Sequence, residues 1–375
     1  MRTNSDVVII GGGLAGLAGA LHLSQSGLTV TLIEKSSYPR HKVCGEYVSN
    51  EILPYLNWLD IDILKLHPTE ISKFEFSSHK GKIASANLPL GGFGISRYQL
   101  DNFLYQKALE KGCLVIKEIV TDVSFDNDLF TISTANQVLS AKIVLGAFGK
   151  RSNIDQVLSR DFFVKKSPWL AVKAHYYGNF PNDVVALHNF KGGYCGVSKV
   201  ENDIVNICYL ADYATFKKYK NIEDYQRNVL HQNQHLKAVF ENGTLLFDKP
   251  LTISQISFDK KLPVENHILM IGDTAGLIHP LCGNGMAMAI HSAKIASELI
   301  LDYYSGKIKS REELEKSYTQ QWKKHFGKRL LMGRILAKIL RNKTVTNTLV
   351  TIAVALPGLL PLIIKQTHGK PITVN

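Results

Sequence analysis

Three glycines near the start of the chain have the spacing of a phosphate-binding turn. Gly11, Gly13 and Gly16 lie between the apolar run 7–10, which predicts a buried strand, and an apolar stretch with helical periodicity. Such a turn lets the backbone approach a pyrophosphate, and the N-terminus of the following helix stabilises its negative charge. Glu34 closes the next predicted strand, where a carboxylate accepts hydrogen bonds from ribose hydroxyls. These residues predict a site for FAD or NAD, and the acid argues against the 2′-phosphate of NADP.

The elements that would hold this turn come from distant parts of the chain. Residues 14–26 are predicted to form the helix that follows the turn, and residues 28–33 the second strand. Another strand–turn–helix pattern begins much later, around Gly272 and Asp273. Between them, residues 161–262 show alternating short strands and one helical stretch, which is typical of an α+β domain. We therefore expect one nucleotide-binding domain assembled from separated segments, with a second domain inserted.

Cysteine and charge counts narrow the class of protein. The five cysteines include no Cys-x-x-Cys pair, which argues against a disulfide framework, predicts no metal site and fits a reducing cytoplasm. The apolar run at the N-terminus is too short for a signal peptide. The formal net charge is +12, but residues 306–375 alone carry 14 Lys and Arg against 3 acids. The basic character therefore belongs to the C-terminal segment, and the rest of the chain is nearly neutral.

The C-terminal segment combines this positive charge with apolar residues. Residues 318–343 interleave Lys and Arg with Leu, Ile and Met, which predicts a basic amphipathic helix. The uncharged stretch 349–364 contains two prolines and is shorter than the roughly 20 residues of a simple membrane span. Two alternatives stay open: this stretch lies in the interface of an anionic membrane, or it packs on the protein and caps a substrate cavity. No nucleic-acid partner is expected, because no nucleic-acid-binding fold accompanies the basic residues.

Four segments occur in the order found in one superfamily of flavoproteins. They are the glycine turn, the predicted helix ISRYQLDNFL, the turn GAFGKRS and the segment GDTAGLIHPLCGNG. They resemble FAD-dependent oxidoreductases of the p-hydroxybenzoate-hydroxylase fold, and the stretch RHKVCGE is most similar to the geranylgeranyl-reductase-like branch. The resemblance covers residues 6–305. It implies an α/β fold with a Rossmann-type FAD-binding domain, an inserted α+β substrate domain with a mostly antiparallel sheet, and a helical C-terminal segment.

The chain pattern and the resemblance together predict three parts. These are an FAD-binding domain of residues 1–70, 97–155 and 266–305, a substrate domain of residues 71–96 and 156–265, and a C-terminal segment of residues 306–375.

The resemblance also implies which residues hold FAD. Glu34 would bind the ADP half, while Arg40 and Arg97 would lie near the pyrophosphate and the ribityl chain. Asp273 would bind ribityl hydroxyls, and the helix that begins at Met286 would direct its N-terminus at the flavin ring. The complete predicted set is Gly11, Gly13, Leu14, Ala15, Gly16, Glu34, Lys35, Arg40, Arg97, Val120, Gly272, Asp273, Pro280, Gly283, Asn284, Gly285 and Met286.

Cys44 and Glu46 are the candidate catalytic residues. The resemblance places both against the flavin ring on the substrate side, with Glu46 as a proton donor or as an acid that orients the substrate. Two departures from the family pattern bear on the reaction. Phe148 stands where many hydroxylases of this fold carry an Asp that helps them respond to NADPH, which disfavours hydroxylation. Of the aromatic residues that isoprenoid reductases place on an inner strand, only Tyr194 is present, which argues against an isoprenoid substrate.

These observations predict an FAD-dependent oxidoreductase that acts on a lipophilic or polyketide/phenolic small molecule. Hydride transfer to an unsaturated bond is the expected reaction, with NADPH or NADH as the electron donor. Two alternatives stay open: an FAD-dependent monooxygenase that hydroxylates an aromatic or phenolic lipid, and a membrane-associated flavoprotein electron carrier. We expect a cytoplasmic protein in peripheral contact with the inner face of the cytoplasmic membrane through its C-terminal segment.

Overall fold

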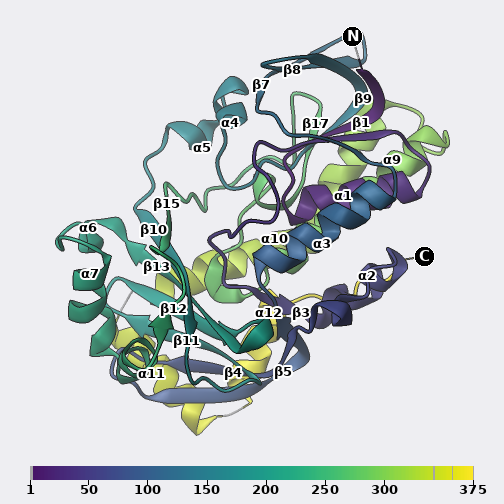
Figure 1. Cartoon of the computed structure of the whole chain (residues 1–375). Coiled ribbons are helices and arrows are strands. Elements are labelled where there is room, and N and C mark those ends of the chain that lie inside the picture. Colours follow the sequence, from purple (N-terminus) through teal and green to yellow (C-terminus); the bar gives the residue numbers. More distant parts are fainter. Residues whose placement is uncertain (1–2, 341–342, 357, 375) are drawn as a thin grey trace.

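Two β-sheets organise the chain in a computed structural model, which describes residues 3–340, 343–356 and 358–374 (Figure 1). The first sheet contains β1 (Thr3–Ile10), β2 (Val30–Ile33), β6 (Leu114–Ile116), β7 (Val120–Asp126), β8 (Leu129–Thr134), β9 (Val138–Gly146), β16 (Val264–Glu265) and β17 (Ile268–Met270). Its strand order is β16-β17-β9-β1-β2-β6, and the hairpin β7–β8 pairs with β9. From β17 to β6 all neighbours in this order are parallel.

The carboxyl ends of three strands meet at one edge of this sheet. The register places Ile10 of β1 opposite Gly146 of β9, and Gly146 opposite Met270 of β17. Helix α1 (Leu14–Gln25) follows β1 and contacts both α3 (Arg97–Glu110) and α9 (Gly285–Tyr304), as Figure 1 shows. In open α/β sheets, ligands bind in the crevice outside the carboxyl ends of the strands. This edge is therefore where a ligand site is expected.

The second sheet contains β3 (Tyr47–Ser49), β4 (Thr69–Ser77), β5 (Ile83–Gly94), β10 (Trp169–Tyr177), β11 (Val184–Phe190), β12 (Gly193–Lys199), β13 (Ile204–Asp212), β14 (Thr244–Leu245) and β15 (Leu251–Ser254). Its order is β14-β10-β13-β12-β11-β4-β5-β3, with β15 paired to β10. The pair β4–β11 is parallel and the other described pairs are antiparallel. Its strands thus come mainly from the inserted part of the chain.

Short helices and 3₁₀ turns connect these strands. They are η1 (Asn50–Ile52), α2 (Leu53–Trp58), η2 (Ile63–Leu66), α4 (Asn153–Val157), α5 (Asp161–Val164), η3 (Glu201–Asp203), α6 (Tyr213–Phe216), α7 (Ile222–Asn228), η4 (Leu230–Gln232), α8 (Gln234–Glu241), η5 (Gly272–Thr274) and η6 (Pro280–Cys282). The helical stretch predicted within residues 161–262 is divided into several of these. Asn221 and Asn233 cause the division, because each side chain caps the start of a new helix.

Three helices form the C-terminal segment: α10 (Arg311–Leu340), α11 (Lys343–Ala355) and α12 (Leu359–Thr367). The predicted basic helix is part of α10, and α11 and α12 pack against β5 at the lower edge of Figure 1. Among the described residues, no single helix has the length and apolar composition of a membrane span; α11 and α12 reach it only as a pair bent by 116°. The predicted α/β fold, with its inserted, mostly antiparallel sheet and helical C-terminal segment, is confirmed.

Candidate functional site

The glycine turn lies where β1 and β9 end. Gly11 has a φ of +107°, and a side chain there would clash with the backbone at the end of β9. A side chain at Gly16 would overlap the carbonyl oxygen of Gly11, so α1 packs directly on the turn. Space is open at Gly13, where a Cβ would meet only Lys42 Nζ at 3.8 Å and Arg97 Nη2 at 3.9 Å. The turn thus leaves room for an anionic group beside two cations.

Asp101, which was not among the predicted site residues, holds both cations in place. Arg97 donates to its carboxylate from Nε (2.6 Å) and Nη2 (2.7 Å), and Lys42 donates from Nζ (2.8 Å). Asp101 is fully buried. Burial opposes its ionisation, but Arg97 and Lys42 together lower the pKa of its carboxyl. The available sequence signal was its position four residues after Arg97, since such pairs face each other on a helix.

Glu34 and Arg40 form a second charged pair under the turn. Glu34 accepts a hydrogen bond from the Gly12 N–H (2.8 Å) and lies 2.9 Å from Arg40 Nη2. Burial opposes the ionisation of Glu34, but Arg40 and Lys42 lower the pKa of its carboxyl. The second guanidinium nitrogen of Arg40, Nη1, is buried and has no hydrogen-bond partner in the described part of the chain. That donor is therefore available to an oxygen of a bound ligand.

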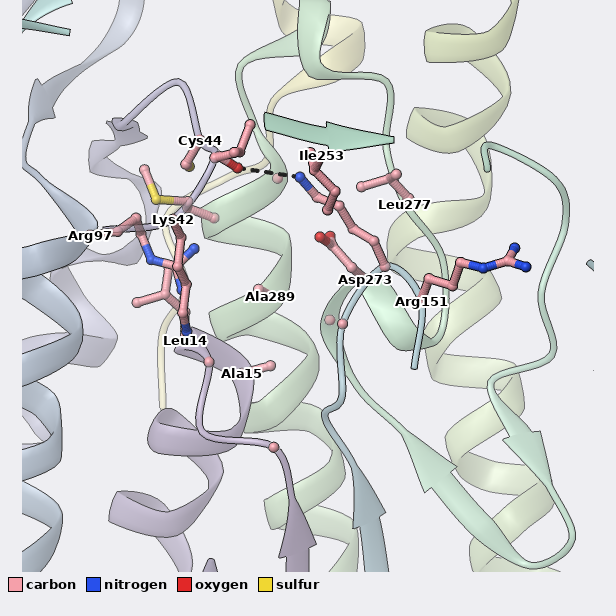
Figure 2. A pocket seen from close by; sticks show the side chains of 18 of the residues that line it. Leu14, Ala15, Lys42, Cys44, Arg97, Arg151, Ile253, Asp273, Leu277 and Ala289 are labelled. Atoms are coloured by element: carbon pink, nitrogen blue, oxygen red, sulfur yellow. Dashed lines mark hydrogen bonds between the residues drawn. The ribbon is translucent and has the colours of Figure 1, made fainter. Parts of the chain in front are cut away.

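The second glycine segment reaches the same cavity from the end of β17. Gly272 has a φ of +61°, and a Cβ there would lie 2.9 Å from the Cβ of Ala15, so η5 packs tightly on α1. Asp273 lines the cavity opposite Arg97 (Figure 2), and Met286 at the start of α9 lines it as well. The N-terminus of α9 therefore faces this cavity, as does that of α1.

Asn284 has a different environment from its neighbours in this segment. Its side chain donates to Glu51 (3.2 Å) and accepts from Arg329 Nη1 (3.2 Å), which also donates to Glu51 (3.2 Å). The N–H groups of Gly369 (2.5 Å) and Ile372 (2.7 Å) donate to the Glu51 carboxylate and carbonyl. We call this group the Glu51 tie. It joins the turn before α9 to helix α10 and to residues 369–372.

The turn and the second segment line one cavity of about 650 Å³. Such a volume is typical of sites for sizeable ligands. Both sheets contribute to its walls. Of the predicted site residues, Gly16 and Asn284 are not part of the lining. The others line it: Gly11, Gly13, Leu14, Ala15, Glu34, Lys35, Arg40, Cys44, Glu46, Arg97, Val120, Gly272, Asp273, Pro280, Gly283, Gly285 and Met286.

Glu46 is fully buried and accepts three hydrogen bonds. Its donors are Lys173 Nζ (2.6 Å), His175 Nε2 (2.7 Å) and the Arg97 N–H (2.7 Å). Burial opposes ionisation, but the bonds from His175 and Lys173 hold the pKa of this carboxyl below its usual value. An ionised acid with three donors cannot give up a proton. The geometry therefore favours a positioning role over proton donation, because Glu46 fastens its loop to β10 and α3.

Cys44 lies on this fastened loop and faces the cavity. Figure 2 shows Cys44, Lys42 and Arg97 on one side, with Asp273 and Leu277 on the other. The loop backbone is held from the second sheet, where an Asn206 amide donates to the carbonyl of Gly45 (2.8 Å). The Cys44 thiol is half-buried. Its position is thus fixed between the glycine turn and the second sheet.

Lys150, which was not predicted, also lines the cavity from the turn after β9. Its Nζ donates to the carbonyl of Val43 (3.4 Å), so the side chain reaches from this turn to the loop that carries Cys44. Lys261 ties the same turn to η5, because its Nζ donates to the carbonyls of Lys150 and Asp273 (both 3.0 Å). Burial lowers the pKa of Lys261 to about 8. Lys150 lies within the GAFGKRS turn but was not among the predicted site residues, and no motif marked Lys261.

The inner face of the second sheet closes the other end of the cavity. The strand register places Ala171, Leu210 and Tyr194 in one row across β10, β13 and β12. These residues, with Leu187, present apolar surface to the cavity. We call this the substrate end, and the region around the glycine turn the cofactor end. The substrate end is lined by Tyr47, Ala171, Leu187, Tyr194, Gly196, Cys208, Leu210, Ile253, Ile256 and Leu277.

Tyr194 carries the hydroxyl at the far side of the substrate end. It lies 3.1 Å from Nδ1 of His279, and both residues are buried. Burial lowers the pKa of His279 to about 3, so its imidazole is neutral at physiological pH. The pair therefore adds a hydrogen bond but no charge to this end.

The residues at the cofactor end fit FAD. The glycine turn leaves space beside Gly13, the unpartnered Nη1 of Arg40 offers a donor, and two helix N-termini face the cavity. Glu34 is ionised where ribose hydroxyls would donate to it. The apolar substrate end offers a wall for a flat ring and for an apolar ligand above it. A dinucleotide with a flat second ring matches this arrangement, in which a charged region of the cavity is followed by an apolar wall.

Comparison with known proteins agrees with this fit. Residues 6–43 match the family model described as FAD dependent oxidoreductase. The chain is 24% identical to a menaquinone reductase of Mycolicibacterium smegmatis, over 96% of this chain and 92% of that protein. It is 24% identical to a digeranylgeranylglycerophospholipid reductase of Methanosarcina acetivorans, over 91% and 86%. Among solved structures, the flavin-dependent brominase Bmp2 superposes with a TM-score of 0.79 at 19% identity, covering 97% of this chain and 93% of that one.

Proposed function

We propose that this FAD-dependent oxidoreductase, whose sequence is similar to that of a lipid reductase and whose fold matches that of a flavin-dependent brominase, transfers a hydride to an unsaturated bond of a lipophilic or polyketide/phenolic small molecule. One observation carries this proposal. The substrate end is apolar, and Glu46, the carboxylate on the loop that carries Cys44, already accepts three hydrogen bonds. An apolar ligand would be held there by burial, with the bond to be reduced beside the cofactor.

Each region of the cavity has a task in this reaction. FAD, when bound, supplies the hydride from its reduced ring. The backbone of Gly11 and Gly13 and the guanidinium of Arg97 would hold the pyrophosphate, while Asp273 would bind ribityl hydroxyls. The N-terminus of α9 at Met286 would stabilise negative charge on the reduced ring. The side chains of the substrate end would orient the ligand and exclude water.

Reduction of a double bond also requires a proton. The hydride adds two electrons and one hydrogen to the first carbon, and a proton must then reach the second. Cys44 has an exchangeable proton and lines the cavity between its two ends. We assign proton delivery to this thiol, which solvent reprotonates. Glu46 acts through the loop as a positioning residue, since it holds the backbone on which Cys44 lies.

The same lining argues against hydroxylation of a phenol, which needs a base for the phenolic proton. The acids among the described lining residues are Glu34, Glu46, Glu118 and Asp273. Glu34 and Glu118 come from the segments around the first sheet, and Asp273 is the residue that we assign to the ribityl hydroxyls. Glu46 is engaged by its three donors. Phe148 also lines the cavity at the position where many hydroxylases of the fold carry an Asp.

The test is turnover without oxygen. Holoenzyme is incubated anaerobically with NADPH or NADH and, in turn, with menaquinones, geranylgeranyl lipids and alkylphenols. The expected product gains two hydrogens on one carbon–carbon bond. A product that forms only in air and contains an oxygen atom from labelled O₂ would establish the monooxygenase alternative instead. Reduction of an added quinone to its hydroquinone, with no hydrogen added to any carbon atom, would establish an electron carrier.

Two variants test the role of Cys44. Cys44→Ala should lower kcat at least about tenfold, because the positioned proton is lost. Cys44→Ser keeps an exchangeable proton and should retain more of the activity. Both variants should keep bound FAD, measured by flavin absorbance per protein. Equal activity in Cys44→Ala and the unmodified protein would remove Cys44 from the mechanism.

A further inference from the structure

The bend between α11 and α12 exposes large apolar side chains. Val354, Leu356 and Leu362 are 42%, 59% and 59% exposed. The opposite faces of the two helices are buried, with Val350 and Leu360 packed on the protein. These helices therefore have one face that the protein covers and an apolar bend that it does not. Adjacent exposed apolar residues of this size mark an interaction surface.

Basic side chains surround this bend. Lys82, in the β4–β5 hairpin, donates from Nζ to Thr351 Oγ1 (3.4 Å), one helical turn before the bend. Lys365 lies one turn after Leu362 on α12 and is exposed. Residues 316–375 contain eleven Lys and Arg and no Asp or Glu. An apolar bend with only basic residues in its own segment is complementary to a bilayer with anionic headgroups.

The buried face of these helices continues into the cavity. Val350, Ala353, Leu360 and Ile364 belong to one apolar cluster that also contains lining residues of the substrate end. Those shared lining residues are Tyr47, Ala171, Leu187, Tyr194, Leu210, Ile256 and Leu277. Because this face packs on the protein, α11 and α12 are not free to enter the bilayer as a span. The bend carries the most exposed leucines of the two helices and is the part that would contact the headgroup region.

We infer that the bend formed by Val354, Leu356 and Leu362 inserts into the headgroup region of an anionic bilayer, with Lys82 and Lys365 on the lipid phosphates. A lipophilic substrate would then pass from the bilayer along the apolar cluster into the substrate end. This second part rests on the proposed function, whereas the docking itself does not.

The experiment is sedimentation of full-length holoenzyme with vesicles of phosphatidylcholine alone or with 30% phosphatidylglycerol, without substrate. We expect binding to the anionic vesicles that weakens as salt rises from 0.05 to 0.5 M. Salt screens the attraction between the lysines and the lipid phosphates, because the Debye length falls from about 14 Å to about 4 Å over this range. The double variant Leu356→Glu with Leu362→Glu should bind at least tenfold more weakly. The control Leu64→Glu with Leu129→Glu places the same charges at leucines that are 68% and 43% exposed elsewhere, and should bind normally.

Three outcomes would overturn the inference: no binding to either vesicle, equal binding to neutral vesicles, or equal loss in the test and control variants. Flavin absorbance and thermal unfolding of each variant confirm that it is folded. A shift of the unmodified protein to a dimer that Leu356→Glu abolishes, without vesicle binding, would assign the bend to self-association. Vesicle binding that persists when no double bond is reduced would leave the docking intact and reject the proposed function alone.

Discussion

At the cofactor end of the cavity, charged side chains hold one another in place: Arg97 and Lys42 share Asp101, and Arg40 pairs with Glu34. At the substrate end, apolar side chains from several strands pack together, and Tyr194 and His279 add one neutral hydrogen bond. Removing a partner at the first end leaves a buried charge, which costs far more than a small void or a lost neutral bond. Changes at the cofactor end should therefore have the larger effects.

The largest effect is expected from Gly16→Val. A side chain there overlaps the carbonyl of Gly11, so the turn cannot keep its shape. FAD should be absent from the purified protein, measured by flavin absorbance. The matched control is Gly327→Ala on α10, where a Cβ has open space and FAD content should stay normal. Stoichiometric FAD in Gly16→Val would show that this end is less tightly built than we infer.

Asp101→Ala should have the next largest effect. Loss of this fully buried carboxylate leaves Arg97 and Lys42 without their shared partner, so the free energy of unfolding should fall by about 3–5 kcal/mol. Urea unfolding measures the change. Asp60→Asn, which weakens an exposed pair with Lys111 and keeps a residue type tolerated at the positive φ of this position, is the control and should unfold like the unmodified protein. Equal free energies of unfolding of the two variants would contradict the view that buried charge pairs stabilise the cofactor end.

His279→Asn tests the substrate end through pH. The pKa of His279 is lowered to about 3 by burial, so the folded state excludes a proton that the unfolded chain binds below pH 6.5. The free energy of unfolding is therefore unaffected by this histidine above pH 6.5, and it decreases as the pH falls from 6.5 towards 3. Between pH 7 and pH 5 the unmodified protein should lose about 2 kcal/mol more than the variant. Unfolding at both pH values checks this, and parallel losses would contradict a neutral buried imidazole.

The smallest effect is expected from Tyr194→Phe. The variant keeps the apolar ring but loses the bond to His279, so the free energy of unfolding should fall by about 1 kcal/mol. Its FAD affinity, measured by fluorescence titration, should be unchanged, while KM for the substrate rises. A loss of FAD from Tyr194→Phe would mean that the two ends are coupled.

The predicted part of the site is the part that a local motif specifies. The glycine turn, Glu34 and Asp273 lie next to strands and helices whose periodicity can be read from neighbouring residues. Lys150 was missed because its partner, the carbonyl of Val43, is set by tertiary packing, and so is Lys42, the second partner of Asp101. Gly16 and Asn284 were expected among the cofactor residues, but one packs inside the turn and the other belongs to the Glu51 tie.

The substrate end was hardest to predict. Its rows of side chains depend on the pairing of β10, β13, β12 and β11, and a strand can slip by one residue without any change in local pattern. Lys173 shows the difficulty. The strand register aligns it with Cys208 and Gly196 on a buried face of the second sheet. A lysine is unexpected on such a face, and only the tertiary structure shows that the Glu46 carboxylate accepts its hydrogen bond.

During synthesis, Glu51 leaves the ribosome long before Arg329 and Gly369. Its carboxylate therefore cannot form these hydrogen bonds until most of the chain has been made. Asn284, beside the glycines of the flavin turn, is fixed only when that tie closes. A side chain at position 369 would displace the guanidinium of Arg329 and the carboxylate of Glu51 from their present positions. We therefore expect FAD to bind only after this tie has formed, and a truncation before residue 369 should lower the flavin content of the purified protein.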